Sequence, residues 1–121
     1  MNPTIAARGT AAALLACAAC AAAAPLTFPD LPGVEPQTFD YACAGGATLH
    51  VSYWSTANGQ SFALVPVNGK PLLFVDTIAG SGVRYLANRY VWWTKGPHAD
   101  LYDTMAGPNA PPIVAGCVEQ H

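Results

Sequence analysis

Charged side chains are scarce in this sequence: Asp, Glu, Lys and Arg make up only 10% of its 121 residues. Five basic and seven acidic residues give a net charge of −2, which excludes the basic surface that binding to nucleic acid requires. The hydrophobic content of 52% excludes a disordered acidic or basic tail. A chain of this length has room for one small domain.

Helical periodicity is also missing, and 11 Gly and 11 Pro interrupt the chain throughout. Short apolar runs alternate instead with turn signals, as in Leu49, Val51 and Tyr53, which share one side of an extended strand. Asn58-Gly59 and Asn68-Gly69 are typical of tight hairpin turns. About eight short strands at even spacing predict an all-β fold, a small antiparallel up-and-down β-barrel with a filled interior.

The N-terminal apolar segment is short and rich in Ala, which argues against a membrane span. Arg8 is its one charge, and an Ala/Leu stretch follows, as in an export signal. Leu14-Leu15-Ala16-Cys17 resembles the bacterial lipobox, in which the Cys is lipidated and becomes the first mature residue. We therefore expect a lipoprotein signal peptide at 1–16 and lipid attachment at Cys17. The alternative is ordinary cleavage within 21–24.

Residues 17–38 are expected to form an Ala/Pro-rich tether ahead of a folded domain at 39–121. A lipidated chain would be an outer-membrane lipoprotein facing the periplasm, whereas cleavage near Ala24 would give a soluble periplasmic protein. Cys17 and Cys20 have the C-x-x-C spacing but no surrounding βαβ pattern, so they give little support for a redox or metal role.

Two further cysteines, Cys43 and Cys117, fall in the first and last expected strands. An exported chain meets oxidising conditions, so we expect them to form a disulfide that joins the two ends of the sheet. The alternative is a pair of free buried thiols.

No catalytic arrangement emerges from the polar residues. His50, His98 and His121 lack the spacing of metal ligands. A triad could be composed from Ser81, His98 and Asp100, but nothing like a nucleophile elbow surrounds Ser81. We therefore expect neither an enzyme nor a cofactor or metal.

Ser81 and Lys95 are the conspicuous polar residues of this low-charge sheet. Ser81 lies between two glycines, and Lys95 ends an aromatic strand just before Gly96-Pro97. An ammonium and a hydroxyl on neighbouring loops would suit a target that displays carboxylates in a cleft. Two solvated turn residues are the simpler interpretation of the same pattern.

A set of short motifs in a fixed order indicates a resemblance to a known protein family. The set comprises Tyr41-Ala42-Cys43, Gly46, Leu49–Tyr53, Ser81-Gly82-Val83-Arg84-Tyr85, Trp93-Thr94-Lys95-Gly96, Ala99, Leu101 and Cys117. With these motifs the sequence resembles the membrane-bound inhibitors of c-type lysozyme and their periplasmic relatives. That family consists of small antiparallel β-barrels, often lipid-anchored, that inhibit c-type lysozyme. The resemblance therefore implies this fold and c-type lysozyme as the partner.

The resemblance also implies roles for individual residues. The family's Ser and Lys enter the lysozyme cleft, which points to Ser81 and Lys95 here. The other expected contributors shape the loops or brace them from the sheet: Gly82, Gly96, Tyr85 and Trp93. His98 and the Asn88-Arg89 connection depart from the family pattern. The contacts near them are therefore expected to differ from those of other family members.

Two alternatives of other classes remain open. The aromatic residues would permit a barrel that holds a small apolar molecule between its strands. The Pro-rich tether would permit a purely structural lipoprotein of the envelope.

Overall fold

A computed structural model describes residues 3–4, 9–16, 28, 30–31 and 35–121 of the chain. Cys17, Cys20, the alternative cleavage region at 21–24 and most of the expected tether lie outside these residues. Within the described part of the chain, no helix has both the length and the apolar character needed to cross a membrane.

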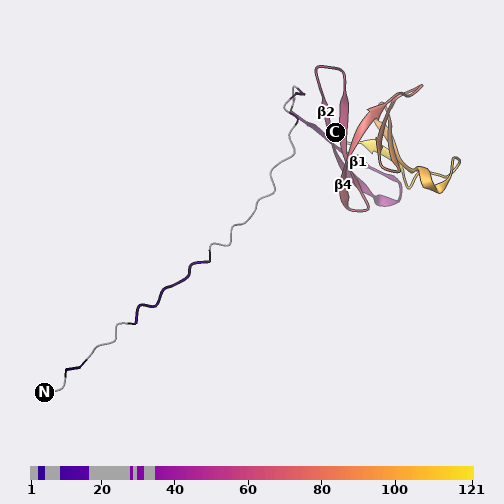
Figure 1. The fold of residues 1–121 in the computed structure, drawn as a ribbon. Helices are drawn as coiled ribbons and strands as arrows, with labels where there is room; N and C mark the ends of the chain where they lie inside the picture. Colours follow the sequence, from indigo (N-terminus) through magenta and orange to yellow (C-terminus); the bar gives the residue numbers. More distant parts are fainter. Residues whose placement is uncertain (1–2, 5–8, 17–27, 29, 32–34) are drawn as a thin grey trace.

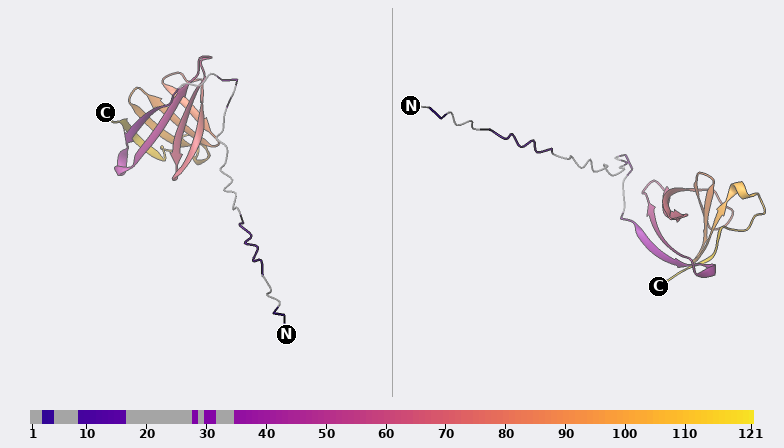
Figure 2. Two further views of the ribbon diagram at one scale, coloured as in Figure 1. Left: turned by 90° about the vertical axis from the view of Figure 1, so that its left-hand side faces the viewer. Right: turned by 90° about the horizontal axis from the view of Figure 1, so that it is seen from below.

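The folded part is a closed barrel of antiparallel strands (Figures 1 and 2). Each strand pairs with the next along the chain, and the last returns to pair with the first. The strands are β1 (Gln37–Ala42), β2 (Thr48–Ser55), β3 (Ser61–Val67), β4 (Lys70–Thr77), β5 (Val83–Ala87), β6 (Tyr90–Lys95), β7 (His98–Asp103) and β8 (Val114–Glu119). The predicted all-β, up-and-down barrel is confirmed.

Tight turns fix the register of neighbouring strands. Asn68 and Gly69 join β3 to β4 with φ values of 51° and 77°, the left-handed pair that a two-residue hairpin turn needs. Asn88 likewise has a φ of 52° in the β5–β6 turn. A short 3-10 helix (Ala44–Gly46) joins β1 to β2.

Aromatic side chains fill the barrel interior. Trp92 is fully buried, and its indole donates a hydrogen bond of 2.8 Å to the Tyr53 hydroxyl. That hydroxyl shares a second hydrogen bond of 2.8 Å with the Tyr41 hydroxyl, so the buried polar atoms satisfy one another. Burial raises the pKa of Tyr53 far above its ordinary value, and the phenol stays neutral. Among the residues that the structure describes, the filled interior gives no support to a small apolar ligand held between the strands.

The seam between β1 and β8 is the shortest pairing and carries the predicted disulfide. Only Tyr41–Glu119 and Ala42–Val118 are in register there, whereas six residue pairs join β1 to β2. The Cys43–Cys117 bond links residues 74 apart, and Cys43 follows β1 directly rather than lying in it. The disulfide therefore closes the barrel where the backbone ladder is weakest.

Strand alternation determines which loops share an end of the barrel. The chain enters β1 at the end that carries the β2–β3, β4–β5 and β6–β7 loops, because successive strands run in opposite directions. At this end Glu119 donates its backbone N–H to the Pro97 carbonyl at 2.8 Å. The β3–β4 and β5–β6 turns lie at the other end.

Candidate functional site

The β4–β5 loop lies directly against the end of β6. Val83, the first residue of β5, pairs with Thr94 in β6, so Ser81 and Gly82 lie beside Lys95. Gly82 has a φ of +64°, and a Cβ there would lie 2.1 Å from the Thr94 carbonyl oxygen and 2.8 Å from Lys95 Cγ. Only glycine fits this contact. Because Gly82 has no side chain, the β4–β5 loop can pack against the end of β6.

Trp93 holds both loops from the outer wall of the barrel. Its indole nitrogen donates a hydrogen bond of 2.9 Å to the Ser81 carbonyl oxygen. The Lys95 ammonium lies 4.3 Å from the centroid of the same ring, within the range of a cation–π interaction. Ser81 and Lys95 are both exposed, and the described residues place no carboxylate within ion-pair distance of Lys95.

We call the group Ser81, Gly82, Trp93, Lys95 and Gly96 the Ser81–Lys95 edge. Gly96 provides the positive φ of 57° for the β6–β7 turn, and a Cβ there would meet nothing within 4 Å. The structure thus brings together five of the residues that sequence reasoning selected.

Tyr85, the sixth residue selected, lies on the other side of the sheet. Its side chain is 7% exposed inside the barrel, where its ring centroid is 5.7 Å from that of Tyr53. Tyr85 therefore supports β5 from the interior and does not form part of the exposed edge.

Replacement of Gly82 by Ala is expected to separate the β4–β5 loop from β6. The new Cβ would collide with a backbone carbonyl and occupy a left-handed conformation, so we expect a loss of about 2 kcal/mol or more in the free energy of unfolding. The Trp93 indole proton should also lose its hydrogen bond to Ser81, which an NMR chemical shift reports. Gly80→Ala is the matched control because a Cβ at Gly80 meets nothing within 4 Å. Equal behaviour of the two variants would contradict the role of Gly82.

The two departures from the family pattern lie at different ends of the barrel. His98 is opposite Lys95 across β6 and β7 and lines a hollow of about 50 Å³ beside Trp93. Asp100, in the same hollow, accepts a hydrogen bond of 2.8 Å from the Gly116 backbone N–H. His98 thus borders the Ser81–Lys95 edge, whereas Asn88-Arg89 forms the β5–β6 turn at the opposite end.

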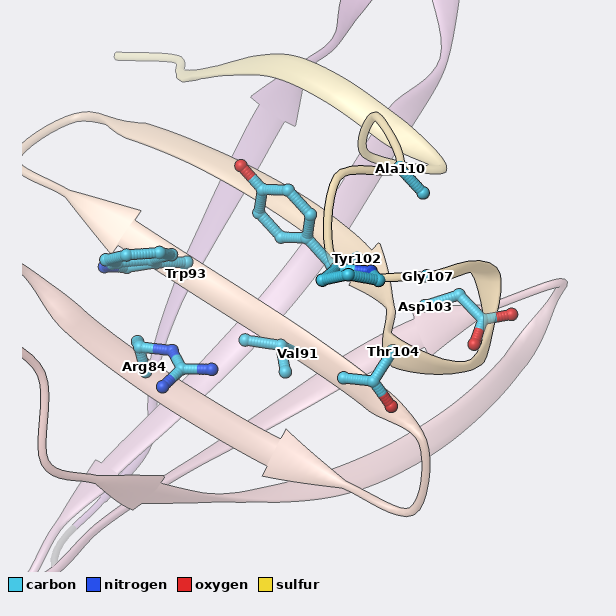
Figure 3. A pocket seen from close by; sticks show the side chains of 9 residues that line it. Arg84, Val91, Trp93, Tyr102, Asp103, Thr104, Gly107 and Ala110 are labelled. Carbon is cyan, nitrogen blue, oxygen red and sulfur yellow. The ribbon is translucent and has the colours of Figure 1, made fainter.

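A larger pocket on the outer wall was not anticipated from the sequence (Figure 3). It has a volume of about 260 Å³, lies over β5, β6 and β7, and is bordered by the segment that follows β7. Arg84 and Trp93 lie at one end of it and Asp103 at the other. We call it the Arg84 pocket. The alternation of β5 could have placed Arg84 outward beside Trp93, its register partner, but the path of the bordering segment has no comparable signal.

An ion pair fixes the far end of the Arg84 pocket. Asp103 accepts two hydrogen bonds of 2.7 Å from Arg89 and one of 3.0 Å from the Met105 backbone N–H. The Arg89 guanidinium holds the pKa of Asp103 below its ordinary value, so this carboxylate stays charged and engaged.

Comparisons of sequence agree on one family. The profile of the family described as "Membrane-bound lysozyme-inhibitor of c-type lysozyme" matches residues 41–110. A Cupriavidus necator protein named "Membrane-bound lysozyme inhibitor of C-type lysozyme" is 39% identical over 119 residues, covering 96% of this chain and 94% of that protein. A Pseudomonas aeruginosa protein of the same name is 38% identical over 81 residues, or 64% of this chain and 63% of that protein.

Solved structures agree with the barrel. Pseudomonas aeruginosa MliC, determined in complex with hen egg white lysozyme, gives a TM-score of 0.61 at 33% identity over 80% of this chain and 98% of that one. PliC-St, a periplasmic lysozyme inhibitor of C-type lysozyme from Salmonella typhimurium, gives 0.62 at 23% identity over 72% and 100%, a likeness of fold. These relatives are named as inhibitors and not as enzymes. The chain therefore belongs to the family of membrane-bound lysozyme inhibitors of c-type lysozyme.

Proposed function

We propose that this protein inhibits c-type lysozyme by inserting Ser81 and Lys95 into the active-site cleft, and so protects bacterial peptidoglycan. Membership of the family and the complex of the Pseudomonas aeruginosa relative with hen egg white lysozyme support this partner. The observation that carries the mechanism is the Ser81–Lys95 edge. There Ser81 and Lys95 are both exposed and lie on neighbouring loops, and Trp93 contacts the Ser81 carbonyl oxygen and the Lys95 ammonium.

The chemistry of glycoside hydrolysis explains why such an edge would inhibit. Lysozyme requires one protonated carboxylic acid and one carboxylate on either side of the scissile bond. The Lys95 ammonium would pair with either group. Paired with the acid, it would stabilise the ionised form and so remove the proton that the leaving group needs. The Ser81 hydroxyl would add a hydrogen bond, and the two loops would occupy the path of the saccharide.

The edge is also prepared for binding before it meets a partner. The Trp93–Ser81 hydrogen bond and the close packing of Gly82 on β6 restrict the β4–β5 loop in the free protein. A loop that is already ordered loses less conformational entropy on binding, which increases affinity.

Titration of hen egg white lysozyme with the purified, oxidised protein tests the proposal. We expect lysis of bacterial cell walls to fall steadily and to stop near one equivalent of inhibitor. The reduced and unfolded chain at the same concentration is the control and should leave lysis unchanged. Full lysozyme activity in excess folded protein would contradict the proposed function.

The proposal also includes the location of the protein in the bacterial cell envelope. We propose that 1–16 is a signal peptide, that Cys17 carries the lipid and that 17–38 tethers the barrel, which would face the periplasm from the outer membrane. The lipobox motif supports this arrangement, as does the membrane-bound name of the relatives. The last two residues of that tether, Gln37 and Thr38, lie in β1. The mass of the mature N-terminus distinguishes a lipidated Cys17 from a soluble periplasmic form.

A further inference from the structure

The Arg84 pocket contains a cation without a counter-ion. Arg84 forms no ion pair with the described residues, and its buried Nε has no hydrogen-bond partner there. Its guanidinium carbon lies 5.2 Å from the centroid of the Trp93 ring, so the main contact of the charge is an aromatic ring. Buried donors in folded proteins are usually paired. The Arg84 side chain that carries this donor lines the pocket, where an acceptor from outside can approach its charge.

The acidic residues around the pocket are engaged elsewhere. Asp103 binds Arg89 through both carboxylate oxygens and lies at the opposite end of the pocket from Arg84 (Figure 3). Asp100, in the neighbouring hollow, accepts from the Gly116 backbone. No carboxylate of the described residues lies within ion-pair distance of Arg84.

We propose that the Arg84 pocket binds a carboxylate supplied from outside the chain, on a group about the size of an amino-acid side chain. The planar guanidinium matches a carboxylate better than it matches any neutral acceptor. The volume of about 260 Å³ is small for a drug-sized ligand, and the walls include Trp93 and the 3% exposed Val91, which suit a short apolar stem.

This pocket is separate from the Ser81–Lys95 edge. Neither Ser81 nor Lys95 lines it, and Trp93 is the residue the two share. The carboxylate could belong to an acidic side chain of a bound protein or to a free small molecule. The binding of a carboxylate does not depend on the proposed function, whereas its assignment to lysozyme does.

The first experiment measures binding of sodium acetate to the isotope-labelled protein by NMR, with sodium chloride at equal ionic strength as reference. We expect saturable shifts of the Trp93 indole N–H and the Arg84 Nε–H with acetate alone. Arg84→Gln should weaken the apparent affinity at least tenfold, and Arg84→Lys, which keeps the charge but not the fork, should be intermediate. Lys95→Gln should keep the Arg84 Nε–H response, and Lys70→Gln should respond like the wild type.

These variants separate the possible results. Lys70 begins β4 at the opposite end of the barrel, so it controls for the loss of one positive charge. Equal shifts in acetate and chloride would overturn the proposal. So would a response that survives in Arg84→Gln and disappears in Lys95→Gln. Dispersed spectra of each variant establish that it is folded.

The second experiment identifies the source of the carboxylate by measuring lysozyme inhibition with the same variants. Inhibition at least tenfold weaker in Arg84→Gln, with Lys70→Gln unchanged, assigns the carboxylate to a lysozyme side chain. Unchanged inhibition together with a lost acetate response assigns it to a free molecule. If the wild-type protein does not inhibit lysozyme, the proposed function fails, and the acetate titration still decides the pocket.

Discussion

Replacement of Lys95 by Ala is expected to weaken inhibition of c-type lysozyme by more than an order of magnitude. The exposed ammonium over Trp93 is the one group of the Ser81–Lys95 edge that can pair with a carboxylate of the cleft. Removal of one partner from a buried, hydrogen-bonded charge pair costs about 2–5 kcal/mol, or roughly 30-fold to several thousand-fold in affinity. Inhibition constants from a cell-wall lysis assay measure the change.

Two other substitutions show whether the effect belongs to the edge. Lys70→Ala removes the same side chain at the opposite end of the barrel and should leave the inhibition constant within about twofold of the wild type, as expected of an exposed surface site. Ser81→Ala removes a single hydroxyl and should weaken inhibition about tenfold, the value of one hydrogen bond to a charged group. Undiminished inhibition by Lys95→Ala would show that the edge does not enter the cleft.

Removal of the Cys43–Cys117 disulfide should cost a large share of the stability of the barrel. In the chain-entropy model a cross-link between residues 74 apart contributes about 4 kcal/mol. A small domain has only about 5–15 kcal/mol in total. The β1–β8 seam has few backbone pairs with which to compensate. Urea unfolding of the Cys43→Ser, Cys117→Ser double variant, followed by tryptophan fluorescence, measures the loss.

The wild-type protein under strong reducing conditions is the matched comparison for that variant. It should unfold at a similarly low urea concentration, because reduction removes the same cross-link without changing any side-chain volume. An unfolding midpoint close to that of the oxidised wild type would show that the seam holds without the disulfide. It would also refute the chain-entropy account for this barrel.

The fold was predictable because its signals are local. Alternation in Leu49, Val51 and Tyr53 and the turn residues Asn68-Gly69 determine strands and hairpins within about ten residues of one another. An up-and-down barrel needs nothing more, since each strand pairs with its neighbour in the chain. The ends of strands were less predictable, since Cys43 was expected in the first strand but follows β1 directly.

The site was predictable only in part. The motifs around Ser81 and Lys95 identified the two loops, but the contact between them depends on the β5–β6 register and on the missing side chain of Gly82. The Arg84 pocket could not be foreseen, because its border depends on hydrogen bonds between distant residues. Thr104, for example, donates both its backbone N–H and its hydroxyl to the Arg89 carbonyl.

The direction in which the chain enters the barrel limits how an anchored molecule could work. Since β1 starts at the same end as the Ser81–Lys95 edge, a tether anchored at Cys17 would join the barrel beside that edge. Roughly 20 intervening residues reach at most about 70 Å when fully extended. A small globular enzyme is about 30 Å across, so it fits within that reach. The length of the tether would then determine how much space a bound enzyme has between the barrel and the membrane.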